Sequence, residues 1–352
     1  MHDPLGVRRR RRRAAIWLAA LTATTAITIV VAVGLGAAYV TPATVAQILG
    51  HHLLGLPETG WEATAEAIVW KVRLPRVLLG GLVGAGLAVT GMALQAMVRN
   101  MLADPYLLGI NSGASSGAAA AILFGAGTGL GTYALPGSAF LGALAASFLV
   151  FALARSGGRV TSLRLLLSGV AVGYLLYGLT SFLIFASGSA EGARSVMFWL
   201  LGSLGLAQWD GLLAVVAIGV LATTVLLTLC GRGLDALAIG DETAHTLGIS
   251  PDRFRTLLLV MVALAVGLVV SAAGSIGFVG LVVPHLARRA VGAAHVAAVP
   301  AAALMGAILL IWADVVARVL LQPQEIPIGI VTALLGAPFL IVLIRRFSAR
   351  AA

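Results

Sequence analysis

Long uncharged stretches alternate with short polar breaks along almost the whole chain. About ten apolar runs result, and most are close to the roughly 20 residues that a helix needs to cross a bilayer. A transmembrane barrel would instead show segments of about ten residues with alternating polarity. The pattern therefore predicts an all-α polytopic membrane protein. The ten expected spanning helices cover residues 14–38, 74–97, 106–125, 133–154, 165–186, 212–229, 256–273, 276–286, 296–317 and 328–344.

The stretch from Arg73 to Gly117 shows how one segment reaches both membrane surfaces. Arg73 and Asn100 lie 27 positions apart, which is roughly 40 Å of helix at about 1.5 Å per residue. That length matches a bilayer with its headgroups. We therefore expect Arg73 at the outer surface and Asn100 at the inner surface.

Two apolar runs do not suit a full span. Residues 187–211 are only moderately apolar and rich in Gly and Ser, so they predict a short helix lying at the outer surface. Residues 276–286 are too few to cross alone. We expect a broken or tilted helix there, ending at Pro284, Arg288 and Arg289. Glycine pairs four residues apart, such as Gly80 with Gly84, Gly113 with Gly117 and Gly127 with Gly131, predict closely packed helices.

Composition agrees with the helical pattern. Hydrophobic residues make up 60% of the chain and charged residues only 10%, and the mean hydropathy is +1.04. The net charge of +10 could suggest nucleic acid as a partner. Sorting the basic residues by loop removes that interpretation. If the N-terminus is inside, 18 of the 23 Lys and Arg residues fall on the cytoplasmic side, as the positive-inside rule requires.

The cytoplasmic set comprises Arg8, Arg9, Arg10, Arg11, Arg12, Arg13, Arg99, Arg155, Arg159, Arg164, Arg232, Arg253, Arg255, Arg288, Arg289, Arg345, Arg346 and Arg350. Only Lys71, Arg73, Arg76, Arg194 and Arg318 fall outside. Both termini are therefore expected in the cytoplasm. The boundaries we predict are a basic N-terminus at 1–13, one ten-helix domain at 14–346 with a long cytoplasmic segment at 231–255, and a tail at 347–352. The first helix is expected to remain uncleaved, because its apolar stretch is about twice as long as that of a signal peptide.

Several classes of function are disfavoured. Lys71 is the only lysine and lies in VWKVR, so the chain has no phosphate-binding loop and should not itself hydrolyse ATP in that way. Buried carboxylates, which proton- and sodium-coupled carriers need, are nearly absent apart from Asp314. No cluster of catalytic or metal-ligating residues appears, and Cys230 stands alone. Adjacent His51 and His52 could touch a metal or haem, but neighbours on a helix do not share a face. We predict no catalytic residue, metal site or cofactor in this chain.

Three motifs resemble those of one family. RLPR at Arg73 to Arg76 is followed by GMALQ, RNMLADPYLLG and NSGASSG; GSIGFVGLVVPHLARRAVG starts at Gly274, and WADVVARVLLQPQEIPIGIVTALLGAPFLIVLIRR at Trp312. In these motifs the chain resembles the FecCD family, the membrane subunits of ABC importers for iron-siderophores, haem and cobalamin. The resemblance implies a type II ABC importer permease fold with ten helices in the bacterial cytoplasmic (inner) membrane.

The resemblance also implies partners. These are a second permease copy, two ATPase subunits that carry ATP and Mg, and an extracytoplasmic substrate-binding protein, besides membrane lipid and without nucleic acid. The expected cargo is a bulky metal chelate, iron-siderophore first, then haem, then cobalamin. A stand-alone secondary carrier or channel is the alternative.

Site residues follow from matching positions. Arg73, Arg76 and Arg318 match arginines that dock the binding protein, with ordinary headgroup contact as the alternative. A cytoplasmic gate matches Asn100, Leu102, Thr161 and Ser162, with helix capping as the alternative. Met101 departs from the family, which usually has proline after this asparagine.

An ATPase-coupling site matches positions in the long cytoplasmic segment. The residues are Gly240, Asp241, Ala244, Leu247 and Gly248. Ala244, Leu247 and Gly248 lie at i, i+3 and i+4, so they are expected to form one small apolar face that seats in a groove on the ATPase. A plain solvated loop is the alternative.

Overall fold

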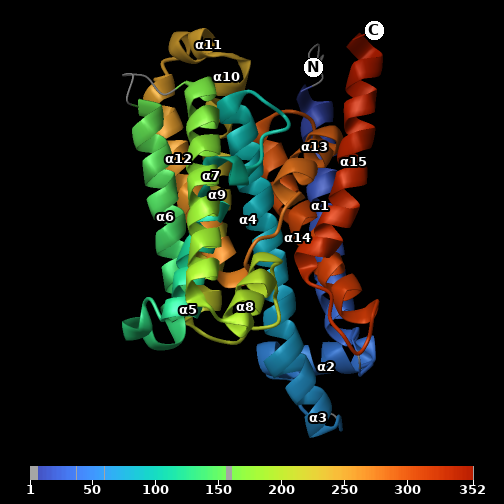
Figure 1. Cartoon of the computed structure of the whole chain (residues 1–352). Helices are drawn as coiled ribbons and strands as arrows, with labels where there is room; N and C mark the ends of the chain where they lie inside the picture. The colour runs from blue at the N-terminus through green and yellow to red at the C-terminus, as the bar shows by residue number, and fades with distance from the viewer. Residues whose placement is uncertain (1–6, 37, 59, 156–160, 352) are drawn as a thin grey trace.

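The computed structural model describes residues 7–36, 38–58, 60–155 and 161–351 (Figure 1). Within these residues every regular element is a helix. Arg159, which the charge pattern assigns to the inner side, lies outside the described residues, as do residues 1–6 of the predicted basic N-terminus and residue 352 of the predicted tail.

Seven helices of the described chain are long and apolar enough to cross a membrane. They are α1 (Val7–Gly34), the continuous helix ending in α4 (Leu74–Val98), α6 (Ala134–Arg155), α7 (Ser162–Ser187), α9 (Gly211–Leu229), α12 (Pro251–Ala273) and α14 (His295–Val319). A helical multi-pass membrane protein is thereby confirmed. The other three predicted spans are helical as well: α5 (Ile110–Phe124), α13 (Val279–Val291) and α15 (Ile328–Ala351). Since α5 and α13 are short, the count of ten crossings stays a prediction.

Most of the shorter helices lie at the two ends of the bundle, whereas Pro105–Leu108 lies deeper, beside Gly280 of α13. The shorter helices are α2 (Pro42–Leu54), α3 (Ala63–Glu66), a π-helix (Ala67–Arg73), two 3-10 helices (Pro105–Leu108 and Thr128–Tyr133), α8 (Ala190–Leu200), α10 (Gly231–Ile239) and α11 (Asp241–Thr246). In Figure 1, α2 and α3 lie at one end, which we call the outer end, and α10 and α11 at the opposite, inner end. The end of α15 lies at the inner end, as does the start of α1.

Two helices start earlier than the apolar pattern predicted. The first begins at Val7, just before the run of arginines 8–13, because arginine is a good helix former. The helix expected from Leu74 begins at Ala63 and passes through the π-helix. A polar sequence can therefore be helical, and hydropathy alone marks only the membrane-embedded part. The capping signals of α2 are visible in the sequence, where Thr41 accepts from the Thr44 N–H and Pro42 occupies the first turn.

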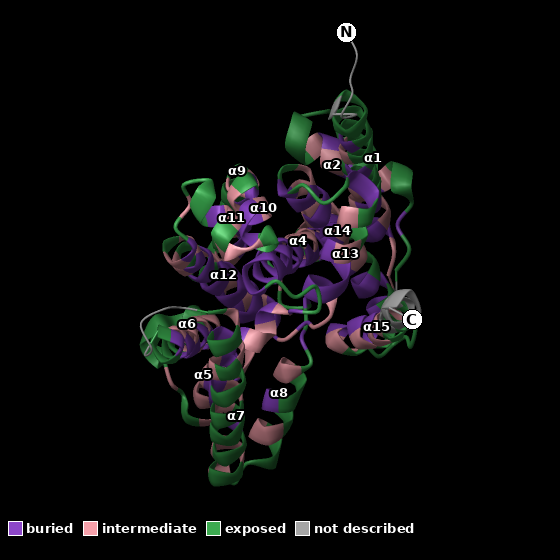
Figure 2. Ribbon diagram, turned by 90° about the horizontal axis from the view of Figure 1, so that it is seen from above, coloured by how far each residue is buried: buried purple, intermediate pink, exposed green. Residues whose placement is uncertain are grey.

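The central helix of the bundle is α4, which packs against α9, α12, α13 and α14 (Figure 2). Its glycines allow the approach: a Cβ on Gly84 would lie 2.1 Å from the carbonyl oxygen of Gly306. A Cβ on Gly91 would lie 2.0 Å from that of Gly280. The predicted close packing is confirmed there. It is wrong for Gly131, where a Cβ would meet nothing within 4 Å. Gly127 approaches Ser138 closely, but both glycines belong to the 3-10 helix and its cap, where the φ angles of Gly127 and Gly131 are 79° and 57°.

Two breaks in the helices are joined by one side chain. The Tyr106 hydroxyl, in the turn between α4 and α5, donates to the Ile276 carbonyl and accepts from the Ile276 N–H, both at 2.9 Å. Ile276 lies in the non-helical stretch between α12 and α13. Non-helical backbone within a membrane protein needs such partners. The short, broken helix expected over residues 276–286 is present as α13, which begins at Val279, contains Pro284 and ends two residues after Arg289.

Candidate functional site

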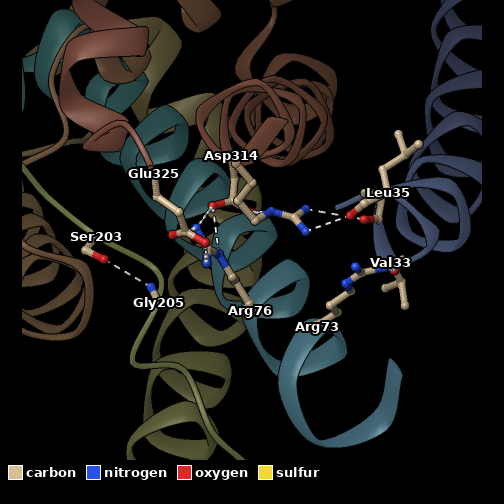
Figure 3. Close-up of polar contacts among 10 residues, drawn as sticks. Val33, Leu35, Arg73, Arg76, Ser203, Gly205, Asp314 and Glu325 are labelled. Carbon is tan, nitrogen blue, oxygen red and sulfur yellow. Dashed lines mark hydrogen bonds and ion pairs between the residues drawn. The ribbon is translucent and has the colours of Figure 1, made fainter. Parts of the chain in front are cut away.

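The three predicted outer arginines meet at the outer end, close to the carboxylates of Asp314 and Glu325 (Figure 3). We call Arg73, Arg76, Asp314, Arg318 and Glu325 the outer corner. The last turn of α1 lies beside it, and carbonyl groups at this helix end face the guanidinium groups. A helix C-terminus carries unpaired carbonyls and a partial negative charge, so it attracts cations.

Arg73 is bound to the end of α1. Its Nη1 donates to the carbonyls of Val33 and Gly34, each at 3.0 Å, and its Nη2 donates to the carbonyl of Ala38 at 2.5 Å. A Cβ at Gly36 would lie 2.5 Å from Arg73 Nη2, so only glycine leaves room for the guanidinium. The Arg73 residue is 7% exposed. In this chain it therefore fastens α1 to α4.

Arg318 reaches the same helix end from α14. Its Nη1 donates to the Leu35 carbonyl at 2.9 Å and its Nη2 to the Ala32 carbonyl at 3.3 Å. Its Nε forms an ion pair with Asp314 Oδ2 at 2.9 Å, one helical turn away. Asp314 is buried. Arg318 thus joins α14 to α1 and balances a buried carboxylate.

Arg76, whose side chain is 12% exposed, lies between a buried and an exposed carboxylate of the outer corner. Its Nε donates to Asp314 Oδ1 at 3.0 Å, and its Nη1 donates to Glu325 Oε1 at 3.0 Å. The Glu325 side chain is 52% exposed, whereas that of Asp314 is 2% exposed. A cavity of about 400 Å³ adjoins this pair and is lined also by Ser203 and Trp199. Among the three arginines, Arg76 has the partner that solvent can replace.

At the inner end, the predicted gate residues are also helix caps. Asn100 Oδ1 accepts from the Leu102 N–H at 2.9 Å, and Thr161 accepts from the Arg164 N–H as the N-cap of α7. Ser162 Oγ donates to the Met97 carbonyl at 3.4 Å, which brings the start of α7 to the end of α4. Asn100, Met101 and Leu102 are exposed. The two helix ends meet, and their role as a gate stays a prediction.

Sequence reasoning missed a buried glutamine that supports this turn. Gln95 donates to the carbonyls of Ala103, Gly280 and Leu281 at 3.3–3.4 Å, and it accepts from Arg288. It is 3% exposed. Gln95 therefore holds the turn after α4 against α13. Its place in the apolar run after Gly91 gave a weak signal, since a lone amide in such a run needs buried partners.

The predicted coupling residues lie on α11 and the turns beside it. Both carboxylate oxygens of Asp241 accept from Arg255, at 2.9 Å and 2.7 Å. These hydrogen bonds lower the pKa of the Asp241 carboxyl from its usual value. Arg255 is 1% exposed, and its Nε also donates to the Met97 carbonyl at 3.4 Å. One arginine thus connects α11 to the end of α4, where Ser162 also donates.

The predicted docking face of α11 needs a correction. Ala244 is fully buried, while Leu247 is 64% exposed and Gly248 is also exposed. Ala244, Leu247 and Gly248 therefore do not share one exposed face. The reason is that α11 ends at Thr246, so the i, i+3, i+4 spacing does not continue beyond it. Gly248 has a φ of 77° in the turn that follows. Exposed apolar side chains flank α11 on both sides, Ile239 before it and Leu247 after it.

A second link from the coupling segment was also missed. Asp235 Oδ1 on α10 lies 2.5 Å from His295 Nδ1 and accepts from the His295 N–H at 3.0 Å, at the start of α14. A cavity of about 500 Å³ lies beside this contact and is lined also by Asn100, Met101 and Arg288. The same helix α14 carries Asp314 and Arg318 near its other end. Helix α14 therefore runs from a contact with the coupling segment at its start to the outer corner near its end.

The structure offers no metal site in the residues it describes, since no group of three or more His, Cys, Asp or Glu side chains lies close together there. The two outer histidines have other partners. His52 Nε2 contacts Glu66 Oε1 at 2.8 Å, and His51 Nδ1 contacts the Leu56 carbonyl at 2.7 Å. His52 also stacks on Trp70, with ring centroids 4.1 Å apart.

Comparison with known proteins gives a consistent result. The model of the FecCD transport family matches residues 24–346. The chain is 44% identical over 297 residues to the cobalamin import system permease protein of Halobacterium salinarum, covering 84% of this chain and 77% of the relative. It is 42% identical over 295 residues to the hemin transport system permease protein of Yersinia pestis, covering 82% and 87%. A solved structure, described as an inward-facing metal-chelate type ABC transporter, superposes with a TM-score of 0.81 at 33% identity, covering 94% of this chain and 98% of that one.

Proposed function

This chain belongs to the FecCD transport family, and on that premise we propose that it is the permease subunit of an ATP-driven importer that moves a bulky metal chelate into the cytoplasm. The family and the relatives support a transport subunit rather than an enzyme. ATP and Mg would then be bound by separate ATPase subunits. The membrane in question would be the bacterial cytoplasmic membrane, with both termini inside.

The cargo class rests on the names of the relatives. One relative imports cobalamin and another hemin, and the structural neighbour is of the metal-chelate type. Cobalamin, hemin and metal chelates are all bulky and enclose their metal. The transport path therefore need not coordinate the metal ion itself. We keep iron-siderophore, haem and cobalamin as the cargoes to be compared.

The observation that carries the proposal is the contact between the coupling segment and the helix ends at the inner side. An ATPase subunit seated on α10 and α11 would press on Asp241, which is bound to Arg255, which in turn holds the Met97 carbonyl at the end of α4. Ser162 of α7 meets the same carbonyl. Movement of α11 would thus reach Asn100, Leu102, Thr161 and Ser162, the proposed gate, through directly bonded groups.

We assign docking of a substrate-binding protein to the outer corner. Arg76 is the residue proposed to contact it, because its exposed partner Glu325 can be exchanged for a carboxylate of the binding protein. Arginine pairs with carboxylates through two parallel hydrogen bonds, which fixes orientation. Arg73 and Arg318 would support docking indirectly, by holding α1 and α14 in place. A second copy of the chain would complete the central path.

Reconstitution tests the proposal. Proteoliposomes containing this chain, the cognate ATPase and the cognate binding protein should take up the labelled chelate only when ATP is inside. Leaving out any one component should abolish uptake. Transport by this chain alone would favour a secondary carrier or channel and refute the proposal. The chelate held by the purified binding protein, compared among the three cargo types, identifies the cargo.

A further inference from the structure

An apolar groove lies between α6 and α12, with a volume of about 190 Å³. Its walls include Leu144, Phe148 and Phe151 of α6 and Leu259, Ala263 and Leu264 of α12. Both helices are candidate membrane spans. The groove opens to the surface of the chain, since Phe148 is 69% exposed. The molecule that fills it must come from the membrane or from another chain.

The hydroxyl groups in the groove are already bonded. Ser147 Oγ donates to the Ala143 carbonyl and Thr256 Oγ1 to the Asp252 carbonyl, each at 2.9 Å within its own helix. The other lining side chains are hydrocarbon. A polar occupant would therefore lose its hydrogen bonds with water and gain none. The groove suits a hydrocarbon chain, which gains dispersion contacts on both walls.

The inner end of the groove is positively charged. The Arg155 guanidinium carbon lies 5.8 Å from the centre of the Phe151 ring, so the charge lies beside one wall of the groove. Arg253 is exposed in the first turn of α12. Neither arginine forms an ion pair with another residue of the described chain. The neighbouring carboxylate, Asp252, is half-buried. The pair of arginines is available for an external anion.

The distance from the two arginines to the far end of the groove matches one leaflet of the bilayer. Arg155 lies eleven residues after Leu144 on α6, and Arg253 lies eleven residues before Leu264 on α12. Eleven residues of helix measure about 16 Å, which is close to half of the roughly 30 Å hydrocarbon core. On both helices the charge and the far end of the groove are thus separated by about the reach of an acyl chain.

We propose that this groove binds a phospholipid of the inner leaflet, with an acyl chain between α6 and α12 and an anionic headgroup on Arg155 and Arg253. Charge complementarity selects an anionic lipid over a zwitterionic one. The site is separate from the outer corner and from α10 and α11, and it shares only Arg253 with the cytoplasmic segment 231–255. The proposal does not depend on the cargo or on the ATPase.

Native mass spectrometry of the full chain in detergent tests it, with dioleoyl phosphatidylglycerol and dioleoyl phosphatidylcholine as probes that share their acyl chains. The wild type should retain the anionic lipid preferentially. Arg155→Gln and Arg253→Gln should each weaken that retention about fivefold and leave the zwitterionic lipid unchanged. Arg10→Gln with Arg12→Gln, exposed on α1, is the control and should change neither. Ala263→Phe, which fills the groove, should weaken retention of both lipids.

Four results would overturn the proposal, three of them from the lipid-retention measurement. The three are equal retention of the two lipids by the wild type, unchanged retention in the Arg155→Gln, Arg253→Gln double variant, and loss in the α1 control equal to the loss in that variant. A fourth is disulfide crosslinking of Val260→Cys between two copies in a Cys230→Ser background, which would assign the groove to a second chain. Because Arg155 and Arg253 are exposed, their variants are expected to fold.

Discussion

Arg76 and Glu325 form an ion pair at the outer corner, with Nη2 and Oε2 2.9 Å apart. The same guanidinium is held from the buried side by Asp314. Arg76 therefore has one fixed partner and one exchangeable partner. If a binding protein docks here, Glu325 competes with its carboxylates for the same group.

Removing this competitor should strengthen docking. We expect Glu325→Gln to raise the affinity of the binding protein by up to about fivefold, because an exposed ion pair contributes about 0.2–1 kcal/mol. Arg76→Gln should weaken binding. Surface plasmon resonance on the permease in nanodiscs measures both. Glu191→Gln removes another exposed carboxylate, on α8, and is the matched control. An equal gain in that control would mean that net charge, and not competition, is responsible.

Replacing Asp314 should lower the stability of the fold, whereas replacing Glu325 should not. Asp314→Asn leaves two arginines, Arg76 and Arg318, facing a neutral amide in a buried site. Loss of one partner from a buried pair costs about 3–5 kcal/mol. We expect a clear drop of the unfolding midpoint in detergent, while Glu325→Gln stays within about 0.5 kcal/mol of the wild type. Equal midpoints for the two variants would contradict the difference in burial.

The contact between Arg73 and α1 gives a third prediction. Arg73→Met removes the Arg73 donor from the carbonyls of Val33 and Ala38, whereas the Gly34 carbonyl keeps the Val40 N–H. Each buried group left unsatisfied costs about 1–3 kcal/mol. Lys71→Met, two residues away and exposed, is the control and should be neutral. Hydrogen exchange at the end of α1 should increase in the Arg73 variant only. Unchanged exchange would mean that α1 is held by its apolar contacts alone.

The sequence predicted the spanning helices within a few residues wherever an apolar run carried the signal, as for α6, α7, α9 and α14. It could not predict what Arg73 does, because the carbonyls that Arg73 binds lie 35–40 residues away and carry no side-chain signal. Arg255 looked like the last residue of a polar segment, yet it lies in the second turn of α12 and is buried. Local patterns give helices, whereas such contacts depend on how the helices pack. The burial of Ala244 was missed for the same reason.

Close packing of α4 gives a fourth prediction. A Cβ at Gly91 meets the Gly280 backbone at 2.0 Å, but a Cβ at Gly81 meets side-chain atoms of Ile311 and Ala307 at 3.4 Å or more, which is ordinary van der Waals contact. Gly91→Ala should therefore destabilise the bundle by about 1–3 kcal/mol or more, since the backbone must move. Gly81→Ala, on the same helix, should be tolerated. The measurement compares the unfolding midpoints of the two variants in one detergent. Similar values for both variants would show that α4 is not tightly packed at Gly91.

The ion pair between Asp241 and Arg255 should control ATPase attachment. Asp241→Asn leaves a buried guanidinium without its carboxylate, and hydrogen bonds to charged groups contribute about 1.5–3 kcal/mol. If α11 is positioned by this pair, the affinity for the ATPase should fall about 10- to 100-fold. Glu242→Gln, the exposed neighbour, is the control. Equal losses in both variants would indicate a general charge effect rather than a positioning role.

The same pair predicts how attachment depends on pH. Arg255 lowers the pKa of Asp241 below its ordinary value of 3.8. A carboxyl whose pKa is lower in the folded state contributes stability above its ordinary pKa and loses it as the pH falls through the lowered value. Titration of this pair should therefore not change the ATPase affinity of the wild type between pH 8 and 5. The Asp241→Asn variant should bind the ATPase weakly across that whole range. Titration of affinity against pH for the wild type and this variant tests both statements. A wild-type loss between pH 7 and 5 that is absent from the Asp241→Asn variant would contradict them, because it would require Asp241 to be protonated well above its ordinary pKa.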